Sequence, residues 1–323
     1  MLHLRVISPS DRTADVLSLL DGATGVTNIV VMPGAGHRPK GDVLLFDAAR
    51  EATNEIIERL KELRLPEDGS IAVERVDLSL SQVADAAEAE APGAPDDAVV
   101  WEEFSRQVAG DCRVTWAFLA FLTIATQLAA IGVLLPSLIL IVGAMVLGPE
   151  FGAVAGISFG LLRRDARLIG SAARALVIGF AVAIAVTCVC ALLYSAVGWI
   201  TPHSLDGHAE VEFIVKPDKW SFIVALLAGG AGVLSVTAGK SSALVGVFIS
   251  VTTVPAAGYA AVALALGRWG DVGGSVVQLA VNIAGMVIAG TLTLLVQRFF
   301  WSKYGVRITR APVQHARAGS RRS

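Results

Sequence analysis

The stretch Leu138–Leu162 constrains this chain most, because it is long and apolar enough to cross a bilayer yet carries Gly148-Pro149-Glu150 near its middle. Proline lacks a backbone donor and clashes with the carbonyl four residues back, so the helix is expected to kink or break there. In lipid the freed backbone groups must meet protein or a water-filled cavity, and an ionisable side chain is costly. The sequence therefore predicts an interrupted membrane helix, with Glu150 as a candidate functional residue.

Three glycines follow the break at a spacing of four residues, and they are Gly152, Gly156 and Gly160. Residues four apart share one helix face, so these glycines form a ridge that lets another helix backbone approach closely. We expect this ridge to be buried by helix packing, either within the chain or across a homo-oligomer.

The composition indicates two regions. The chain is 54% hydrophobic and 17% charged, whereas soluble domains carry about 25% charged residues. Residues 1–113 have the composition of a soluble protein, and 114–301 contain long apolar runs. The sequence therefore predicts a soluble domain followed by a membrane domain.

The soluble domain, 1–80, alternates between strand and helix patterns. Strands are expected at 2–7, 25–32, 42–47 and 70–78, and helices at 10–21 and 50–63. The order βαββαβ is typical of the ferredoxin-like α+β fold, in which two helices cover one face of a sheet. That fold hosts many functions, including the sensing of small ligands, so it does not identify one.

A glycine-rich basic loop is expected between the two middle strands. Successive backbone N–H groups can form an anion-binding nest, so the loop is a candidate anion or ligand site with residues Gly34, Gly36, His37, Arg38 and Lys40. No helix N-terminus is expected after it, which favours the alternative of a flexible basic hairpin.

Residues 81–113 are expected to connect the two regions. The first part is acidic, contains two prolines and no basic residue, and is predicted to be a solvated linker. In the second part Val100, Trp101, Phe104 and Val108 share one face of a helix. This pattern predicts an interfacial helix on the membrane surface, or alternatively a packed connector helix.

Six membrane spans are predicted at about 114–135, 138–162, 168–199, 220–238, 242–266 and 272–299. Arginines lie between the second and third spans, and the tail 302–323 is basic, whereas the loop 200–219 is acidic. By the positive-inside rule the protein is predicted to be a multi-pass protein of the inner (plasma) membrane with both termini in the cytoplasm.

The six spans divide into two sets of three. Pro149 and Pro255 both fall near midspan, and Asp165 and Asp271 follow them at the same offset. An odd number of spans per set inverts the second set, so the all-α membrane domain is predicted to contain two inverted three-helix repeats with interrupted second and fifth helices. Alternatively, the two prolines only kink two packed helices.

Polar side chains gather at similar depth to the two prolines. They are candidates for one substrate or ion site in the middle of the membrane, formed by Pro149, Glu150, Thr252, Thr253, Pro255, Gln127, Gln278 and Asn282. The alternative is that each only stabilises helix packing. Glu150 is expected either to stay protonated and tie two broken helices together, or to ionise when the cavity hydrates or a cation arrives.

The sequence contains no set of residues whose types and spacing indicate an enzyme active site. There is no P-loop, selectivity-filter run, metalloprotease helix or haem site, so we predict no enzyme, no cofactor, no metal site and no nucleic-acid partner. The expected partners are the lipid bilayer, an unidentified small solute or ion, and further copies of this chain.

Two segments that follow the small N-terminal domain resemble one known family. The segments are IVGAMVLGPEFGAVAGISFGLLRRD and LVGVFISVTTVPAAGYAAVALALGRWGD, and the family is the uncharacterised hydrophobic domain family, domain of unknown function 389. The resemblance covers most of the chain. It implies the fold and a membrane location, but no substrate.

The expected function is that of a transporter or channel-like permease for a small solute or ion, with a regulatory cytoplasmic domain. This expectation rests on the broken helices and the polar residues near them. The alternatives are a membrane-embedded ligand sensor or regulator and a structural membrane scaffold.

Overall fold

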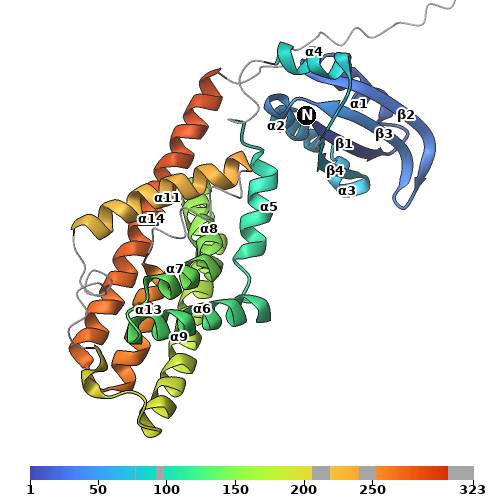
Figure 1. Cartoon of the computed structure of the whole chain (residues 1–323). Helices are drawn as coiled ribbons and strands as arrows, with labels where there is room; N and C mark the ends of the chain where they lie inside the picture. Colours follow the sequence, from blue (N-terminus) through green and yellow to red (C-terminus); the bar gives the residue numbers. More distant parts are fainter. Residues whose placement is uncertain (77, 92–97, 206–218, 240–251, 305–323) are drawn as a thin grey trace, which may run out of the picture. The chain divides into compact units, whose positions relative to one another are not determined.

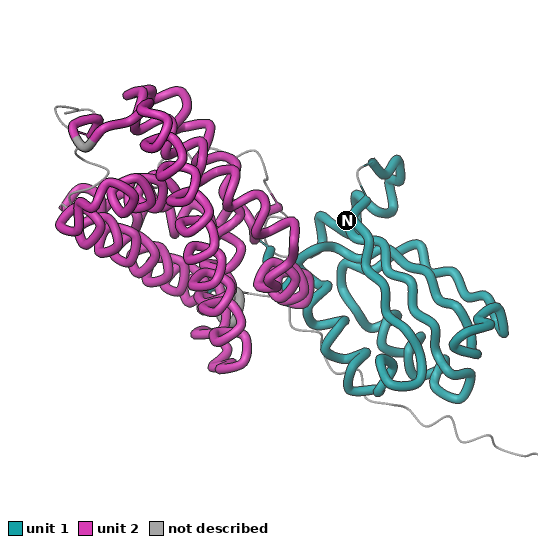
Figure 2. Tube along the Cα trace, turned by 90° about the horizontal axis from the view of Figure 1, so that it is seen from below, with its two compact units in different colours: residues 1–101, 300–323 teal, residues 102–299 magenta. Residues whose placement is uncertain are grey.

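The computed structural model describes residues 1–76, 78–91, 98–205, 219–239 and 252–304 (Figure 1). The chain divides into two compact units (Figure 2). The first unit includes Met1–Trp101, and the second is Glu102–Phe299. Every strand of the described residues lies in the first unit, and the second unit is helical.

The first unit is built on a four-stranded antiparallel sheet with the strand order β2-β3-β1-β4. The strands are β1 (Leu2–Ser8), β2 (Val26–His37), β3 (Lys40–Ala48) and β4 (Ser70–Arg75). Successive side chains of a strand point to opposite faces, so alternate apolar residues set the register. Leu4 of β1 lies opposite Phe46 and Val73, and both Leu4 and Phe46 are fully buried.

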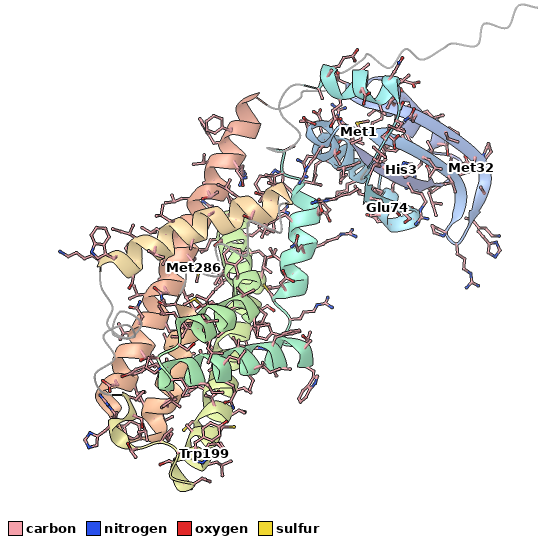
Figure 3. The ribbon with its side chains drawn as sticks, viewed as in Figure 1. Met1, His3, Met32, Glu74, Trp199 and Met286 are labelled. Carbon is pink, nitrogen blue, oxygen red and sulfur yellow. The ribbon has the colours of Figure 1, made fainter. Side chains whose placement is uncertain are left out.

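Helices cover one face of this sheet and leave the other face open. They are α1 (Thr13–Asp21), α2 (Arg50–Glu62) and the short α3 (Leu65–Asp68). Leu20 of α1 and Ile56 of α2 share one buried core with Leu4 and Phe46. His3, Met32 and Glu74 belong to the opposite face, and Figure 3 shows their positions. The element order agrees with the prediction, except that α3 is additional and β2 is longer.

The segment after residue 81 differs from the predicted linker. It forms α4 (Gln82–Glu90), where the Ser81 hydroxyl accepts a hydrogen bond from the Ala84 N–H at 3.2 Å. The Met1 ammonium lies 3.3 Å from Glu88 Oε1. The segment is thus helical although most of its residues are exposed, because a cap, several alanines and an ion pair stabilise a helix despite its acidity. Its role as a linker stays a prediction. Residues 92–97 lie outside the described residues.

The second unit is a helical bundle with α13 at its centre. Its described helices are α5 (Trp101–Asp111), α6 (Trp116–Leu134), α7 (Leu138–Leu147), α8 (Glu150–Arg163), α9 (Ala166–Ala196), α11 (Lys219–Ala238), α13 (Thr253–Ala265) and α14 (Trp269–Tyr304), with a 3-10 turn at Pro202–Leu205. α13 contacts α6, α7 and α9, and its residues 253–263 are all buried. A helix that is apolar on every side belongs inside a bundle.

The long helices have the length and composition of membrane spans. Of the described helices, four are long and apolar enough to cross a membrane, or five if the bent pair α7 and α8 is one span. Val177, Leu227 and Leu292 remain more than half exposed on them, which suits lipid rather than water. Trp199 lies at one end of this unit, stacked on Tyr194 (Figure 3). These helices indicate a membrane protein.

The six predicted spans are described in part. The first, third, fourth and sixth correspond to α6, α9, α11 and α14, and the second corresponds to the bent pair. The fifth, 242–266, is described from Thr252 onward as α13, and 240–251 lie outside the described residues, as do 206–218 and 305–323. The six-helix inverted repeat therefore stays a prediction.

Candidate functional site

The predicted break at Gly148-Pro149 separates α7 from α8. α7 ends at Leu147, α8 begins at Glu150, and the two axes are bent by 51°. Pro149 is the N-cap of α8, where a missing N–H removes no hydrogen bond from the helix. The predicted helix break at Gly148-Pro149 is present, and the passage of α7 and α8 through the membrane as one span stays a prediction.

Glu150 joins the starts of two helices that are distant in sequence. It is the first residue of α8, and only 6% of it is exposed. Thr253, the first residue of α13, donates its hydroxyl to Glu150 Oε1 at 2.6 Å. Because helix N-termini carry positive partial charge, both helices favour a carboxyl at this point.

The second oxygen of the Glu150 carboxyl has a different environment. Oε2 is buried and has no hydrogen-bond partner among the described residues. It lies against Gly148, where an added Cβ would collide with it. Gly148 is the C-cap of α7, so Oε2 is next to a helix end whose free carbonyls carry negative partial charge.

Thr252, the residue before Thr253, contacts α14. Asn282 Nδ2 donates to Thr252 Oγ1 at 2.9 Å, and Gln278 Nε2 reaches the same oxygen at 3.5 Å. Gln278 and Asn282 are one turn apart on one face of α14, and both are fully buried. Within the described ranges, Gln278 Oε1 and Ser275 Oγ are buried without a partner.

We call Glu150, Thr252, Thr253, Gln278 and Asn282 the break cluster. These five are predicted site residues, and Pro149 and Pro255 stand at the starts of α8 and α13 beside them. Gln127 is not joined to the cluster by any hydrogen bond in the described part of the chain. It lies half-buried on α6, which approaches α13 at Gly258 instead.

Ser275 is a polar residue at this site that the prediction omits. Its hydroxyl lies one turn before Gln278 on the same face of α14. Its three-residue spacing from Gln278 could have identified it as a site residue. The four-residue spacing between Gln278 and Asn282 identified Asn282 in the same way.

The glycine ridge of α8 contacts other helices of the same chain. An added Cβ would collide with Asp111 at Gly152, with Cys112 Sγ at Gly156 and with Ile169 at Gly160. The end of α5 and the start of α9 therefore fill the ridge, so it is not left free for a second copy of the chain.

α5 runs along α8 in the manner of a packed connector helix. Phe104 and Phe159 meet edge to face with their ring centroids 5.0 Å apart, and Val108 and Cys112 are buried. Its position relative to a bilayer stays a prediction.

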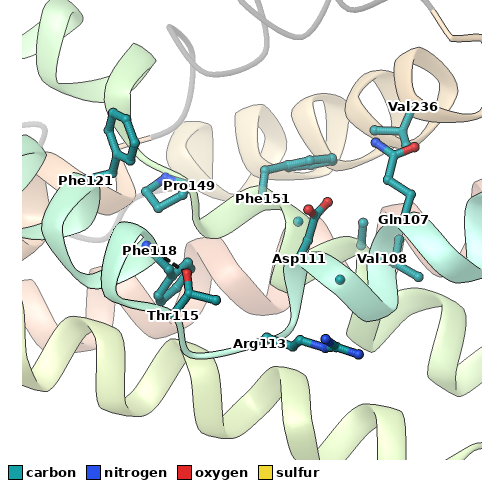
Figure 4. A pocket seen from close by; sticks show the side chains of 13 residues that line it. Gln107, Val108, Asp111, Arg113, Thr115, Phe118, Phe121, Pro149, Phe151 and Val236 are labelled. Atoms are coloured by element: carbon teal, nitrogen blue, oxygen red, sulfur yellow. Dashed lines mark hydrogen bonds between the residues drawn. The ribbon is translucent and has the colours of Figure 1, made fainter.

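A pocket of about 350 Å³ lies beside Pro149 (Figure 4). Residues of α5, α6, α8 and α11 line it, among them Asp111, Phe118, Phe151 and Val236. Partial desolvation raises the pKa of the Asp111 carboxyl above its ordinary value. No member of the break cluster lines this pocket, so the two features are separate.

The candidate anion loop of the first unit is part of a hairpin. Gly36 pairs with Gly41 and His37 with Lys40, so β2 and β3 continue almost to the turn at Arg38-Pro39. The Gly34 N–H donates to Asp42 Oδ1 at 2.8 Å. This arrangement agrees with the basic hairpin that the sequence favoured, because strand pairing and a carboxylate occupy backbone groups that an anion would need. The anion site itself stays a prediction.

Asp42 is held by three donors, and this arrangement leads to a test. Ser10 and Thr13 donate to it at 3.0 and 2.7 Å, in addition to Gly34. The Gly34 N–H is the main cause that lowers the pKa of Asp42. A lowered folded pKa means that the stabilisation is present above the unfolded carboxyl's pKa and is lost as pH falls through the folded value.

We expect Asp42→Asn to accelerate amide exchange at Gly34 and to lower the melting temperature of the first unit. Hydrogen exchange of the full chain, followed by mass spectrometry between pH 7 and pH 3, measures the first effect, and thermal unfolding over the same pH range measures the second. Asp68→Asn is the control, because Asp68 is exposed and pairs only with Arg12 among the described residues. Equal protection of Gly34 in wild type and Asp42→Asn would contradict the anchoring role.

A comparison with known protein families supports the resemblance that the sequence indicated. Residues 145–288 match the family model described as Domain of unknown function (DUF389). The predicted family resemblance is confirmed. The DUF389 segment begins in α7 and ends in α14, so it contains the whole break cluster.

One curated relative is the uncharacterized protein MJ0678 of Methanocaldococcus jannaschii. It is 24% identical over 203 residues, which are 63% of this chain and 60% of the relative. The aligned part thus spans 60% of that relative's length. No solved structure matches the chain significantly.

Proposed function

We propose that this membrane protein is a transporter or channel-like permease for a small solute or ion, and that the break cluster is its substrate or ion site. The observation that carries the proposal is the buried, unpartnered Oε2 of Glu150 at the junction of a broken helix. A buried polar atom without a partner costs free energy, so a site that retains several such atoms is best explained by a ligand that pairs with them for part of a cycle.

The proposed membrane domain consists of two inverted three-helix repeats. In support of this, Pro149 and Pro255 take similar places at the starts of α8 and α13, and these two helix starts are joined by Glu150 and Thr253. Interrupted helices that meet at a repeat interface are typical of secondary transporters. On this proposal both termini are cytoplasmic and the chain assembles as a homo-oligomer in the plasma membrane.

The proposed role of the first unit is regulation by a ferredoxin-like domain. The supporting features are the strand order β2-β3-β1-β4 and the packing of α1 and α2 on one sheet face. The opposite face, with His3, Met32 and Glu74, is accessible for a regulatory contact.

The proposal is tested with the full chain reconstituted into liposomes on a solid-supported membrane. Concentration jumps of protons, Na⁺, K⁺, phosphate and a panel of amino acids are applied, and charge movement and uptake are recorded. We expect at least one jump to give a flux above protein-free liposomes. Glu150→Gln should lower this flux about tenfold, the factor that corresponds to ~1.4 kcal/mol of lost interaction, and should remove its pH dependence.

Ser158→Ala is the matched control. Ser158 is also buried on α8, but its hydroxyl donates only to the carbonyls of Val154 and Val287. Its replacement should leave the flux near the wild-type value. If no jump separates the wild type from protein-free liposomes, the permease proposal is wrong, and the sensor and scaffold alternatives take its place. If Glu150→Gln keeps the full pH dependence, Glu150 has only a structural role.

A further inference from the structure

We propose that the break cluster binds a desolvated monovalent alkali cation at Glu150 Oε2, next to the carbonyl end of α7. This inference deepens the proposed function and rests on it. It concerns what the site binds, and it is separate from the question of which solute crosses the membrane.

The charges at the break favour a cation. The break cluster contains one carboxyl and no basic side chain. Thr253 already holds Oε1, whereas Oε2 lies against Gly148, the C-cap of α7. The last carbonyls of a helix have no partner within it. On this proposal the cation lies between Oε2 and that carbonyl end, where it would stabilise both.

The unpartnered atoms nearby are also oxygens. The amide nitrogens of Gln278 and Asn282 are directed at Thr252, which leaves Gln278 Oε1 without a partner among the described residues. Ser275 Oγ, one turn away on the same face of α14, is also buried without a partner among the described residues. An anion would be repelled by the carboxyl and by these oxygens, whereas a hard cation is bound by carboxylate, carbonyl and hydroxyl oxygens.

The oxygens that are available as ligands also limit the charge of the cation. One carboxylate neutralises one positive charge, and a divalent ion would leave an uncompensated charge in a buried site. Softer metals prefer imidazole or thiolate, and no group of three His, Cys, Asp or Glu side chains that would hold a metal occurs in the described residues. A proton would pair only Oε2 and leave Gln278 Oε1 and Ser275 Oγ unpartnered. On this proposal one alkali cation is bound by Oε2 together with Gln278 Oε1 and Ser275 Oγ, and variants of these residues test whether the three oxygens share one ion.

The test is thermal unfolding of the purified full chain in nanodiscs at constant ionic strength and pH, with Na⁺ or K⁺ replacing choline. We expect the melting temperature to rise with the logarithm of the alkali-ion concentration, because a ligand that binds only the folded state stabilises it by mass action. Glu150→Gln should abolish the rise. Ser275→Ala, a small change that preserves packing, should shift the half-maximal concentration upward several-fold, and Gln278→Leu should shift it further.

Ser158→Ala is again the control and should keep the wild-type dependence on alkali ions. If neither Na⁺ nor K⁺ shifts the melting temperature relative to choline, the cation site is refuted. A shift with pH alone assigns the site to a proton and also overturns the inference. Solute flux that depends on Glu150 but not on any alkali ion would refute the cation site and leave the permease proposal standing.

Discussion

Gly156→Leu is expected to prevent stable folding of the helical unit. A Cβ at this position would overlap Cys112 Sγ and would stand 3.4 Å from Ala172 Cβ, so α5 and α9 enclose the site from two sides. Overpacking of this kind costs about 1–3 kcal/mol and occasionally more. The gain in helix propensity on replacing glycine is at most about 1 kcal/mol. The steric cost should therefore dominate, all the more because leucine adds three carbons beyond Cβ.

The matched control is Gly143→Leu in the other half of the same broken span. Gly143 is exposed on α7, and an added Cβ there has no heavy atom within 4 Å. This variant should be as stable as the wild type, or slightly more stable. Size-exclusion profiles after heating, followed by fluorescence of a C-terminal reporter, would rank the three proteins. Wild-type behaviour of Gly156→Leu would show that the ridge does not form the close contact.

A double-mutant cycle identifies the atom responsible. Gly156→Ala introduces only the Cβ, and Cys112→Ala removes the sulfur that it would strike. We expect the double variant to be more stable than the sum of the two single effects predicts, because each change accommodates the other. Simple additivity would mean that the destabilisation has another origin.

Thr252→Val should strongly destabilise the break cluster. Valine has nearly the shape of threonine but no acceptor, so the buried amides of Asn282 and Gln278 would lose the oxygen to which they donate. Leaving a buried donor unpaired costs about 1–3 kcal/mol. We expect a cost near the upper end, since two donors are affected and the surrounding helix α13 is fully buried.

Thr187→Val is the same chemical change, but it is not expected to lower the stability of the protein. Thr187 is buried on α9, and its hydroxyl has no hydrogen-bond partner in the described structure. Removing an unpartnered hydroxyl should be neutral or stabilising. Melting temperatures of both variants in one detergent provide the comparison. If Thr252→Val and Thr187→Val behave alike, the hydrogen bonds to Thr252 contribute little.

Local features of this chain could be predicted from its sequence because they depend on near neighbours. Pro149 stands near the middle of a long apolar run, where a proline breaks or kinks a helix because it removes a donor and clashes with the preceding turn. The alternation of Leu2, Leu4 and Val6 specifies a strand with one buried face, and long apolar runs specify membrane helices. The helix α4 was not predicted in the acidic segment, because composition alone does not register the cap at Ser81 or the ion pair to Met1.

The contacts of the candidate site were decided by tertiary structure alone. Polarity and depth pointed to Glu150, Thr253 and Asn282, but no local rule says that Glu150 meets Thr253 or that Asn282 meets Thr252. Gln127 has the same polarity, yet no hydrogen bond joins it to the cluster in the described part of the chain. Partners that are distant in sequence are chosen by which helix faces pack together, and that choice depends on the shape of the whole bundle, as Gly156 beneath Cys112 illustrates.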